Sequence, residues 1–236
     1  MANKKKLKDY FNLGMRKLKH RKGFGVHSPF AFSIITEVIE EKLPYYAYST
    51  MQPVYGKQAT IPFKAACLLF RLVNRFKCKN IAQLGCDGGY TILPLLMADS
   101  RNRIYTIAST EEQEEVLSRL SLFQISPERI IWTRPTENLT NDTKYDMIMV
   151  SHNPFTSSKG GKATDEETNR LLEWVLSHSK EETLIFVNGI LPRQELEIFW
   201  DTLCDRDDIT ITMDLYNNGF AILKPRFYKQ HYIVSF

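Results

Sequence analysis

The chain has 236 residues, of which 43% are hydrophobic and 12% aromatic, enough to fill the core of one globular domain. This composition excludes a disordered or fibrous protein. No stretch approaches the roughly 20 apolar residues that a membrane-spanning helix needs, and the first residues contain no apolar signal segment. The four cysteines lack metal-type spacing, which indicates reduced thiols. We therefore expect a cytoplasmic protein without a membrane span.

The net charge of +4 is concentrated at the amino terminus. Residues 1–22 contain nine Lys and Arg against one acid, so this segment carries +8 and the remaining chain −4. A basic arm of this kind is more often a solvated helix face, although nucleic acid or an anionic membrane surface would also attract it. We divide the chain into a basic helical extension and cap at 1–58 and a main domain at 59–236.

Helices are predicted before the first strand. Apolar spacing predicts an amphipathic helix over 4–20, and Ser28-Pro29 is typical of a helix start, with Ser at the N-cap and Pro at the first helical position. Residues 43–58 are rich in Tyr, Pro and Gly and are predicted to form a loop. A further helix is predicted over 62–77.

From residue 80 the chain alternates between strands and helices. The strand-like runs are 80–84, 103–108, 129–133, 145–150 and 182–187, and the helical patterns are Thr91–Ala98, Glu111–Phe123, Asp165–His178 and Pro192–Leu203. Thr110 and Gln113 form a capping-box pattern before the second of these helices. The alternation predicts a doubly wound α/β fold, with a mostly parallel sheet and helices on both faces.

The carboxyl-terminal pattern departs from this alternation. Two strand-like runs, Ile209–Leu215 and Phe220–Lys224, flank Tyr216–Gly219, in which the Asn-Gly pair is a strong hairpin signal. A further strand-like run covers His231–Phe236. We therefore expect a seven-stranded sheet that ends in an antiparallel hairpin.

The best candidate for a ligand site is the turn after the first strand. Open α/β sheets bind ligands beyond the carboxyl ends of their strands, and this strand runs into Gln83-Leu84-Gly85-Cys86-Asp87-Gly88-Gly89. Glycines let backbone N–H groups approach a ligand, although any tight strand-to-helix turn also favours them. The turn alone leaves a purely structural role open.

Several segments together resemble class I S-adenosylmethionine (SAM)-dependent methyltransferases, close to the catechol-type O-methyltransferase branch. The chain also resembles a bacterial group with a Gly-Val-His-Ser-Pro-Phe segment near the amino terminus. The similar segments are Gly25–Phe30, Leu68–Val73, the glycine turn, Tyr145–Val150 and Lys229–Tyr232. The resemblance covers about residues 24–236, and it implies a Rossmann-like methyltransferase fold, SAM as the cofactor and a small hydroxylated methyl acceptor.

The resemblance also implies which residues contact the cofactor. They are Gln83, Gly85, Cys86, Asp87 and Gly89 at the methionyl part, Ala108 and Ser109 at the ribose, and Arg134, Pro135 and Ser151 near the adenine and the transferring methyl. His152 and His27 are the candidate catalytic residues, because a histidine can take a proton from a substrate hydroxyl. At each position the alternative is a histidine without a catalytic role.

Four positions lack an acid that this family usually has: Gln83, Ala108, Ser151 and Asn188. Ser151 and Asn188 are poor Mg²⁺ ligands, so we expect no metal. Loss of the ribose acid would weaken binding about tenfold to a hundredfold, because a hydrogen bond to a carboxylate contributes roughly 1.5–3 kcal/mol. Glu111 or Glu112 is near enough in sequence to reach back toward that position.

The leading hypothesis is therefore a SAM-dependent methyltransferase, with O-methylation of a small hydroxylated molecule as the reaction. A first alternative is a catalytically degenerate protein that keeps the fold as a binding or scaffold module. A second alternative, which we favour less, is a nucleic-acid-associated protein that uses residues 1–22. The sequence leaves a homodimer open and does not identify the methyl acceptor.

Overall fold

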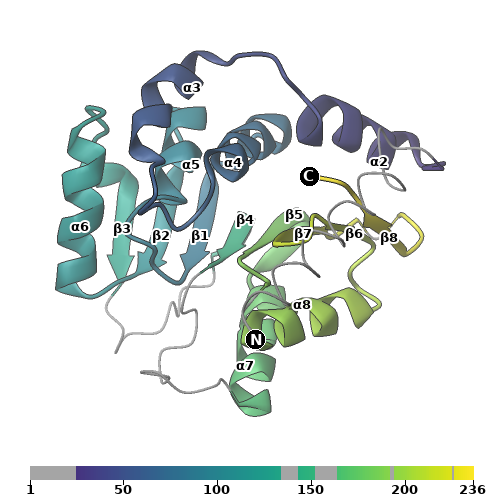
Figure 1. The fold of residues 1–236 in the computed structure, drawn as a ribbon. Coiled ribbons are helices and arrows are strands. Elements are labelled where there is room, and N and C mark those ends of the chain that lie inside the picture. Colours follow the sequence, from purple (N-terminus) through teal and green to yellow (C-terminus); the bar gives the residue numbers. More distant parts are fainter. Residues whose placement is uncertain (1–24, 134–142, 152–163, 192–193, 225) are drawn as a thin grey trace, which may run out of the picture.

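The computed structural model describes residues 25–133, 143–151, 164–191, 194–224 and 226–236. They form an eight-stranded sheet with helices on both faces (Figure 1). The helices are α2 (Pro29–Ile34), η1 (Ile35–Ile39), α3 (Tyr46–Met51), η2 (Gln52–Val54), α4 (Phe63–Phe76), α5 (Ile92–Ala98), α6 (Thr110–Ser121), η3 (Pro127–Arg129), α7 (Asp165–Ser177) and α8 (Gln194–Asp205). The strands are β1 (Asn80–Leu84), β2 (Arg103–Ile107), β3 (Ile130–Thr133), β4 (Tyr145–Val150), β5 (Ser179–Asn188), β6 (Ile211–Asp214), β7 (Asn218–Ile222) and β8 (Gln230–Ile233).

The strand order is β3-β2-β1-β4-β5-β7-β6-β8. Strands β1 to β5 are parallel to one another, and β7 is antiparallel to both β5 and β6. The predicted doubly wound α/β fold and its antiparallel hairpin are thereby confirmed. The predicted count of seven strands is wrong, because β8 pairs in parallel with β6 and adds an eighth strand. Without β8, one side of β6 would expose unpaired backbone groups.

The predicted loop over 43–58 is also wrong in part, because it contains α3 and η2. Ala47 and Met51, four residues apart, are buried on one face of α3. The rings of Tyr45 and Tyr48 both pack against Phe70 of α4. This helix depends on contacts with a distant segment, so the local composition did not reveal it.

Two predicted helix starts have different outcomes. Ser28 caps α2 by accepting a hydrogen bond from the Ala31 N–H at 3.3 Å, as predicted. The capping box of α6 lies one residue earlier than predicted and consists of Ser109 and Glu112. Ser109 has the extended backbone that an N-cap residue needs, and Glu112 three residues later reaches back to its N–H. The helix predicted over 4–20 lies outside the described residues.

The hairpin forms, but its Asn-Gly pair belongs to a strand instead of the turn. Asn218 and Gly219 are the first residues of β7, opposite Asn188 and Val187 of β5. The turn is displaced toward Tyr216, which takes the left-handed φ of 82°. Pairing with β5 therefore outweighed the local preference of the Asn-Gly pair.

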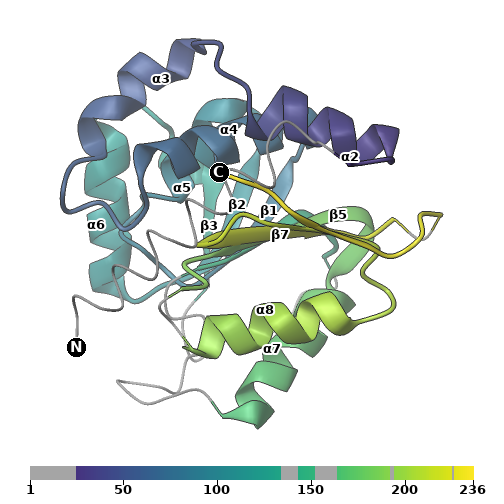
Figure 2. The same ribbon diagram turned by 45° about the vertical axis from the view of Figure 1, so that its right-hand side comes forward.

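The core consists of two clusters, one on each face of the sheet. Helices α2, α4 and α5 cover one face, and α7 and α8 cover the other (Figure 2). Residues of α2, η1 and α3 belong to the same cluster as α4 and the sheet, while the predicted division at residue 58 stays a prediction. Within the described ranges, no helix is both long and apolar enough to cross a membrane.

Candidate functional site

The turn that joins β1 to α5 is held in an unusual backbone conformation. Gly85, Gly88 and Gly89 all have positive φ, at 86°, 67° and 89°. A side chain at Gly88 would also collide with the carboxylate of Glu115 on α6. The glycines therefore allow a shape that other residues adopt only with strain, and they add no side chain at these three positions.

Gln83 lies below this turn and is fully buried. Its Nε2 donates hydrogen bonds to the Gly85 carbonyl at 3.1 Å and to Thr91 Oγ1 at 2.6 Å. Its Oε1 is buried and has no hydrogen-bond partner among the residues that the structure describes. An acceptor left in this way costs about 1–3 kcal/mol, so a ligand that donates a hydrogen bond here would recover that loss.

Asp87 fixes the middle of the turn from inside. It is 4% exposed and accepts hydrogen bonds from the Thr91 N–H at 3.2 Å and from Thr60 Oγ1 at 3.2 Å. Burial raises the pKa of Asp87, and the bonds from Thr91 and Thr60 act in the opposite direction. The side chain is thus engaged with the protein itself, and its predicted contact with a cofactor stays a prediction.

The segment just before α4 covers the turn, which sequence reasoning missed. Tyr55 donates a hydrogen bond to the Tyr90 carbonyl at 2.7 Å, and their ring centroids are 6.0 Å apart. On the other side of Tyr90, the Arg119 guanidinium lies 3.9 Å from the ring centroid. These contacts join segments 35 and 29 residues away from Tyr90, so no local pattern could have identified them.

The end of β2 carries no acid, but α6 brings two acids close to the glycine turn. Ala108 is buried, and Ser109 is occupied as the N-cap of α6, where its N–H donates to Glu112 Oε2 at 2.8 Å. Glu112 reaches back to the Ser109 N–H as part of the capping box, and its role at a ribose stays a prediction. Burial raises the pKa of the Cys86 thiol to about 11, and the nearby charges of Glu112 and Glu115 raise it as well. The turn is therefore bordered by carboxylates from α6, and Cys86 is a neutral thiol at pH 7.

Ser151 follows β4 and is fully buried beside the turn, where its N–H donates to the Leu84 carbonyl at 2.8 Å. Its Oγ accepts a long hydrogen bond of 3.5 Å from Asn188 Nδ2. Within the described ranges, no group of three His, Cys, Asp or Glu side chains is arranged to hold a metal ion. The edge beside the turn is thus neutral and polar.

Of the two candidate catalytic histidines, the structure describes only His27. His27 is exposed, and its neighbour Ser28 hydrogen-bonds the side chain of Tyr232 on β8. Since β8 is the fifth strand from β1, about 24 Å of sheet separates that neighbourhood from the turn. His152, Arg134 and Pro135 lie outside the described residues. The catalytic roles stay predictions.

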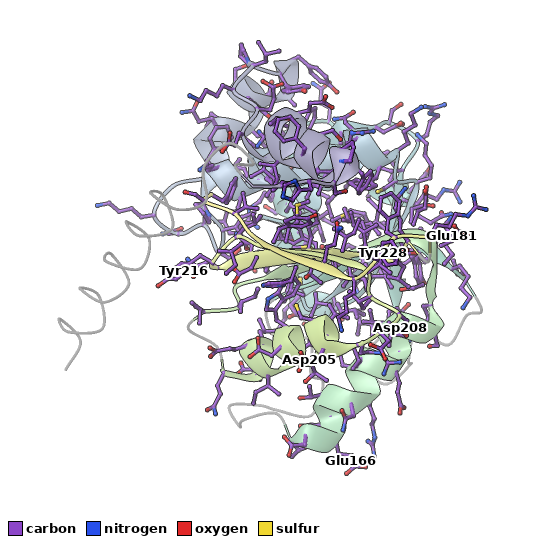
Figure 3. The ribbon with its side chains drawn as sticks, turned by 90° about the vertical axis from the view of Figure 1, so that its right-hand side faces the viewer. Glu166, Glu181, Asp205, Asp208, Tyr216 and Tyr228 are labelled. Atoms are coloured by element: carbon purple, nitrogen blue, oxygen red, sulfur yellow. The ribbon has the colours of Figure 1, made fainter. Side chains whose placement is uncertain are left out.

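A hollow of about 600 Å³ lies near the other end of the sheet, between α8, β6 and the edge strand β8. Figure 3 faces this edge and shows Asp205 on α8 and Tyr216 after β6. Burial raises the pKa of Asp201 in its wall, and the neighbouring Asp205 and Asp214 raise it further. Strands β4, β5 and β7 separate β6 and β8 from β1, so this hollow is not part of the glycine-turn site.

No family model matches the sequence, and no curated protein matches it either. Several solved structures are nevertheless similar in fold. The O-methyltransferase from Bacillus cereus in complex with SAH (S-adenosylhomocysteine) superposes with a TM-score of 0.58 at 15% identity, over 81% of this chain and 97% of that one. TomG, an O-methyltransferase from Streptomyces achromogenes in complex with SAM, gives 0.55 at 17% identity, over 80% and 95%. The SAH-bound methyltransferase from Podospora anserina gives 0.55 at 13% identity, over 83% and 95%.

These similarities show that the fold is the Rossmann-like fold of methyltransferases, with a mostly parallel sheet and a carboxyl-terminal antiparallel hairpin. The chain spans nearly the full length of each of these proteins. At such low identity the likeness concerns the fold, and activity must be argued from the residues of the site.

Proposed function

We propose that this protein binds SAM at the turn after β1 and transfers its methyl group to a small acceptor. The main support for this proposal is Gln83 Oε1, which lies directly below the glycine turn. It is a buried hydrogen-bond acceptor without a partner among the described residues. Similar folds in solved structures contain SAM or SAH. SAM ends in an ammonium group, which donates hydrogen bonds and would satisfy this oxygen.

The rest of the turn also fits such a ligand. Gly85, Gly88 and Gly89 carry no side chain of their own, which favours close approach of the turn backbone to a ligand. At Gly88 the ligand would meet the Glu115 carboxylate, which already lies against that residue. The carboxylates of Glu112 and Glu115 suit a ligand that carries hydroxyl groups and a positively charged sulfonium. They compensate for Ala108, where the resembling family has an acid. The adenine contacts assigned to Arg134 and Pro135 lie outside the described residues.

When bound, SAM would supply an electrophilic methyl group, and its sulfur would leave as the thioether of SAH. The protein has to hold the acceptor close and in line, which alone can contribute most of the acceleration. The proton of the acceptor then needs a base, and His152 is our prediction for it. Such a reaction requires no metal.

The test is calorimetric titration of the full chain with SAM, SAH and 5′-methylthioadenosine, which lacks the amino-acid part. Gln83→Leu should weaken SAM and SAH about tenfold to a hundredfold, since a hydrogen bond to a charged group contributes roughly 1.5–3 kcal/mol. It should leave 5′-methylthioadenosine nearly unchanged. Gln52→Leu, at an exposed glutamine, is the matched control.

An absence of heat and of any thermal shift up to millimolar SAM and SAH would refute the proposal. Equal weakening of all three ligands by Gln83→Leu would show that the substitution disturbs the turn in general. SAM binding without methyl transfer to any offered acceptor would favour the degenerate binding module over the enzyme.

A further inference from the structure

The last row of side chains on the α4-covered face of the sheet changes from apolar to polar. Met149, Phe186 and Phe220 lie side by side on β4, β5 and β7 and belong to the core. One step nearer the edge of the sheet, the same face carries Ser151, Asn188 and Asn218, which we call the polar row. They come two residues later than the apolar residues on the β4 and β5 side, and two residues earlier on the antiparallel β7. All three are buried, with exposed fractions of 0%, 7% and 4%.

Among the described residues, the side chains of the polar row make far fewer hydrogen bonds than their groups allow. An asparagine side chain offers two donors and an acceptor oxygen. The bond from Asn188 Nδ2 to Ser151 Oγ is long, at 3.5 Å. Asn218 Oδ1 is buried and has no partner among the described residues. Buried polar groups are nearly always paired, so this oxygen requires an explanation outside the described protein atoms.

The position of the polar row indicates that a second ligand could supply the missing hydrogen bond. Ser151 lies beside the glycine turn, since its N–H is bonded to Leu84. Asn218 is three strands away from β1, about 14 Å along the sheet edge. A ligand at the turn and a second molecule over the polar row would therefore be neighbours. This arrangement rests on the proposed function, in which SAM occupies the turn.

The chemistry of the row limits the second molecule. Asn218 Oδ1 can only accept a hydrogen bond, so the molecule must donate one, and an anion is disfavoured. The row contains no charged side chain, so a formal charge on the molecule would have no partner there. Beyond Asn218 the edge continues with Leu215 and Val234, both buried and apolar. An apolar body with one uncharged donor fits both parts.

We propose that Asn218, supported by Asn188, binds the methyl acceptor, and that this acceptor is an uncharged small molecule with an apolar body and an O–H or N–H donor. This assigns a binding role to a strand residue that the sequence pattern placed in a hairpin turn. The proposed acceptor differs from substrates that bind through a metal ion, because neutral amide side chains recognise it directly.

The test uses phenol, benzamide and benzoate as probes, measured by ligand-observed NMR on the full chain with and without saturating SAH. Phenol and benzamide should bind at least tenfold more tightly than benzoate, which has no donor at neutral pH. Asn218→Leu, nearly equal in size, should weaken both about tenfold. Asn217→Leu, at the adjacent exposed asparagine, should change neither.

Each outcome decides the matter. If Asn218→Leu leaves phenol and benzamide binding unchanged, or benzoate binds as well as they do, the proposal is overturned. If the variant loses thermal stability with unchanged probe binding, a buried water occupies the row instead. Titration of the wild type and the same variants with SAH reports on the turn separately. If the wild type does not bind SAH, the proposed function is refuted, and this result differs from a failure of the probes to distinguish Asn218→Leu.

Discussion

The glycine turn and the polar row lie at the same edge of the sheet, but their chemistry is opposite. The turn is organised by a buried acid, Asp87, that accepts several hydrogen bonds, and it is bordered by the carboxylates of α6. The polar row is neutral, and Asn218 Oδ1 has no hydrogen-bond partner in the part of the chain that the structure describes. A fully bonded charge holds its own backbone in place. An underused amide is better suited to recognise a second molecule.

Gly219 beside the polar row and Gly88 in the turn both lack room for a side chain. The side chain that blocks Gly219 is more rigid than the one that blocks Gly88. At Gly219 a Cβ would lie 2.6 Å from the ring of Trp200, which is 4% exposed. Gly219→Ala should therefore lower the free energy of unfolding by about 1–3 kcal/mol, the usual cost of overpacking. Urea unfolding measures this effect.

Gly56→Ala is the control, because no atom lies within 4 Å of the added carbon, and its effect should stay within about 0.5 kcal/mol. SAH affinity of Gly219→Ala, measured well below its melting temperature, should be within twofold of wild type. A large loss of SAH affinity in Gly219→Ala would show that the two regions do not act separately.

Gly88→Ala should act on the turn instead. Its φ of +67° strains an alanine by about 1–2 kcal/mol, while the obstructing Glu115 side chain can move aside. We expect a smaller loss of stability than at Gly219 and a clear loss of SAH affinity in calorimetry. Gly25→Ala has similar strain, at φ +80° with nothing nearby. If Gly25→Ala weakened SAH equally, backbone strain alone would explain the result.

The smallest effect concerns the charge at Asp87. Burial raises its pKa above the unfolded value of about 3.9. Stability from the protonated form is therefore fully present below the unfolded pKa and is lost as the pH rises through the folded pKa. Asp87→Asn stays neutral, so its stability relative to wild type should increase with pH over this window.

Urea unfolding of both proteins between pH 3 and pH 7 checks this expectation. Asp207→Asn, at a fully exposed carboxylate, should give a curve parallel to wild type. A constant difference between Asp87→Asn and wild type across the range would mean that the buried acid does not titrate as its environment requires.

Much of the fold was predictable because local patterns report which face of an element is buried. The strands over 80–84 and 145–150 have the predicted bounds, since apolar runs between turn residues have few alternative structures. The glycine turn was identified for a similar reason. Its positive φ angles depend on residue types that the sequence displays directly.

Other features were decided by contacts between distant segments. Asn218 and Gly219 are a turn signal locally, but pairing with β5 and the Trp200 ring place them in a strand. Tyr55 and Thr60 reach the glycine turn only because the chain before α4 folds over it. The order and type of most elements follow from the amino-acid pattern, because periodic burial is a local property. The identity of the unpaired polar atoms follows from the folded arrangement, because a hydrogen bond depends on where both partners finally lie.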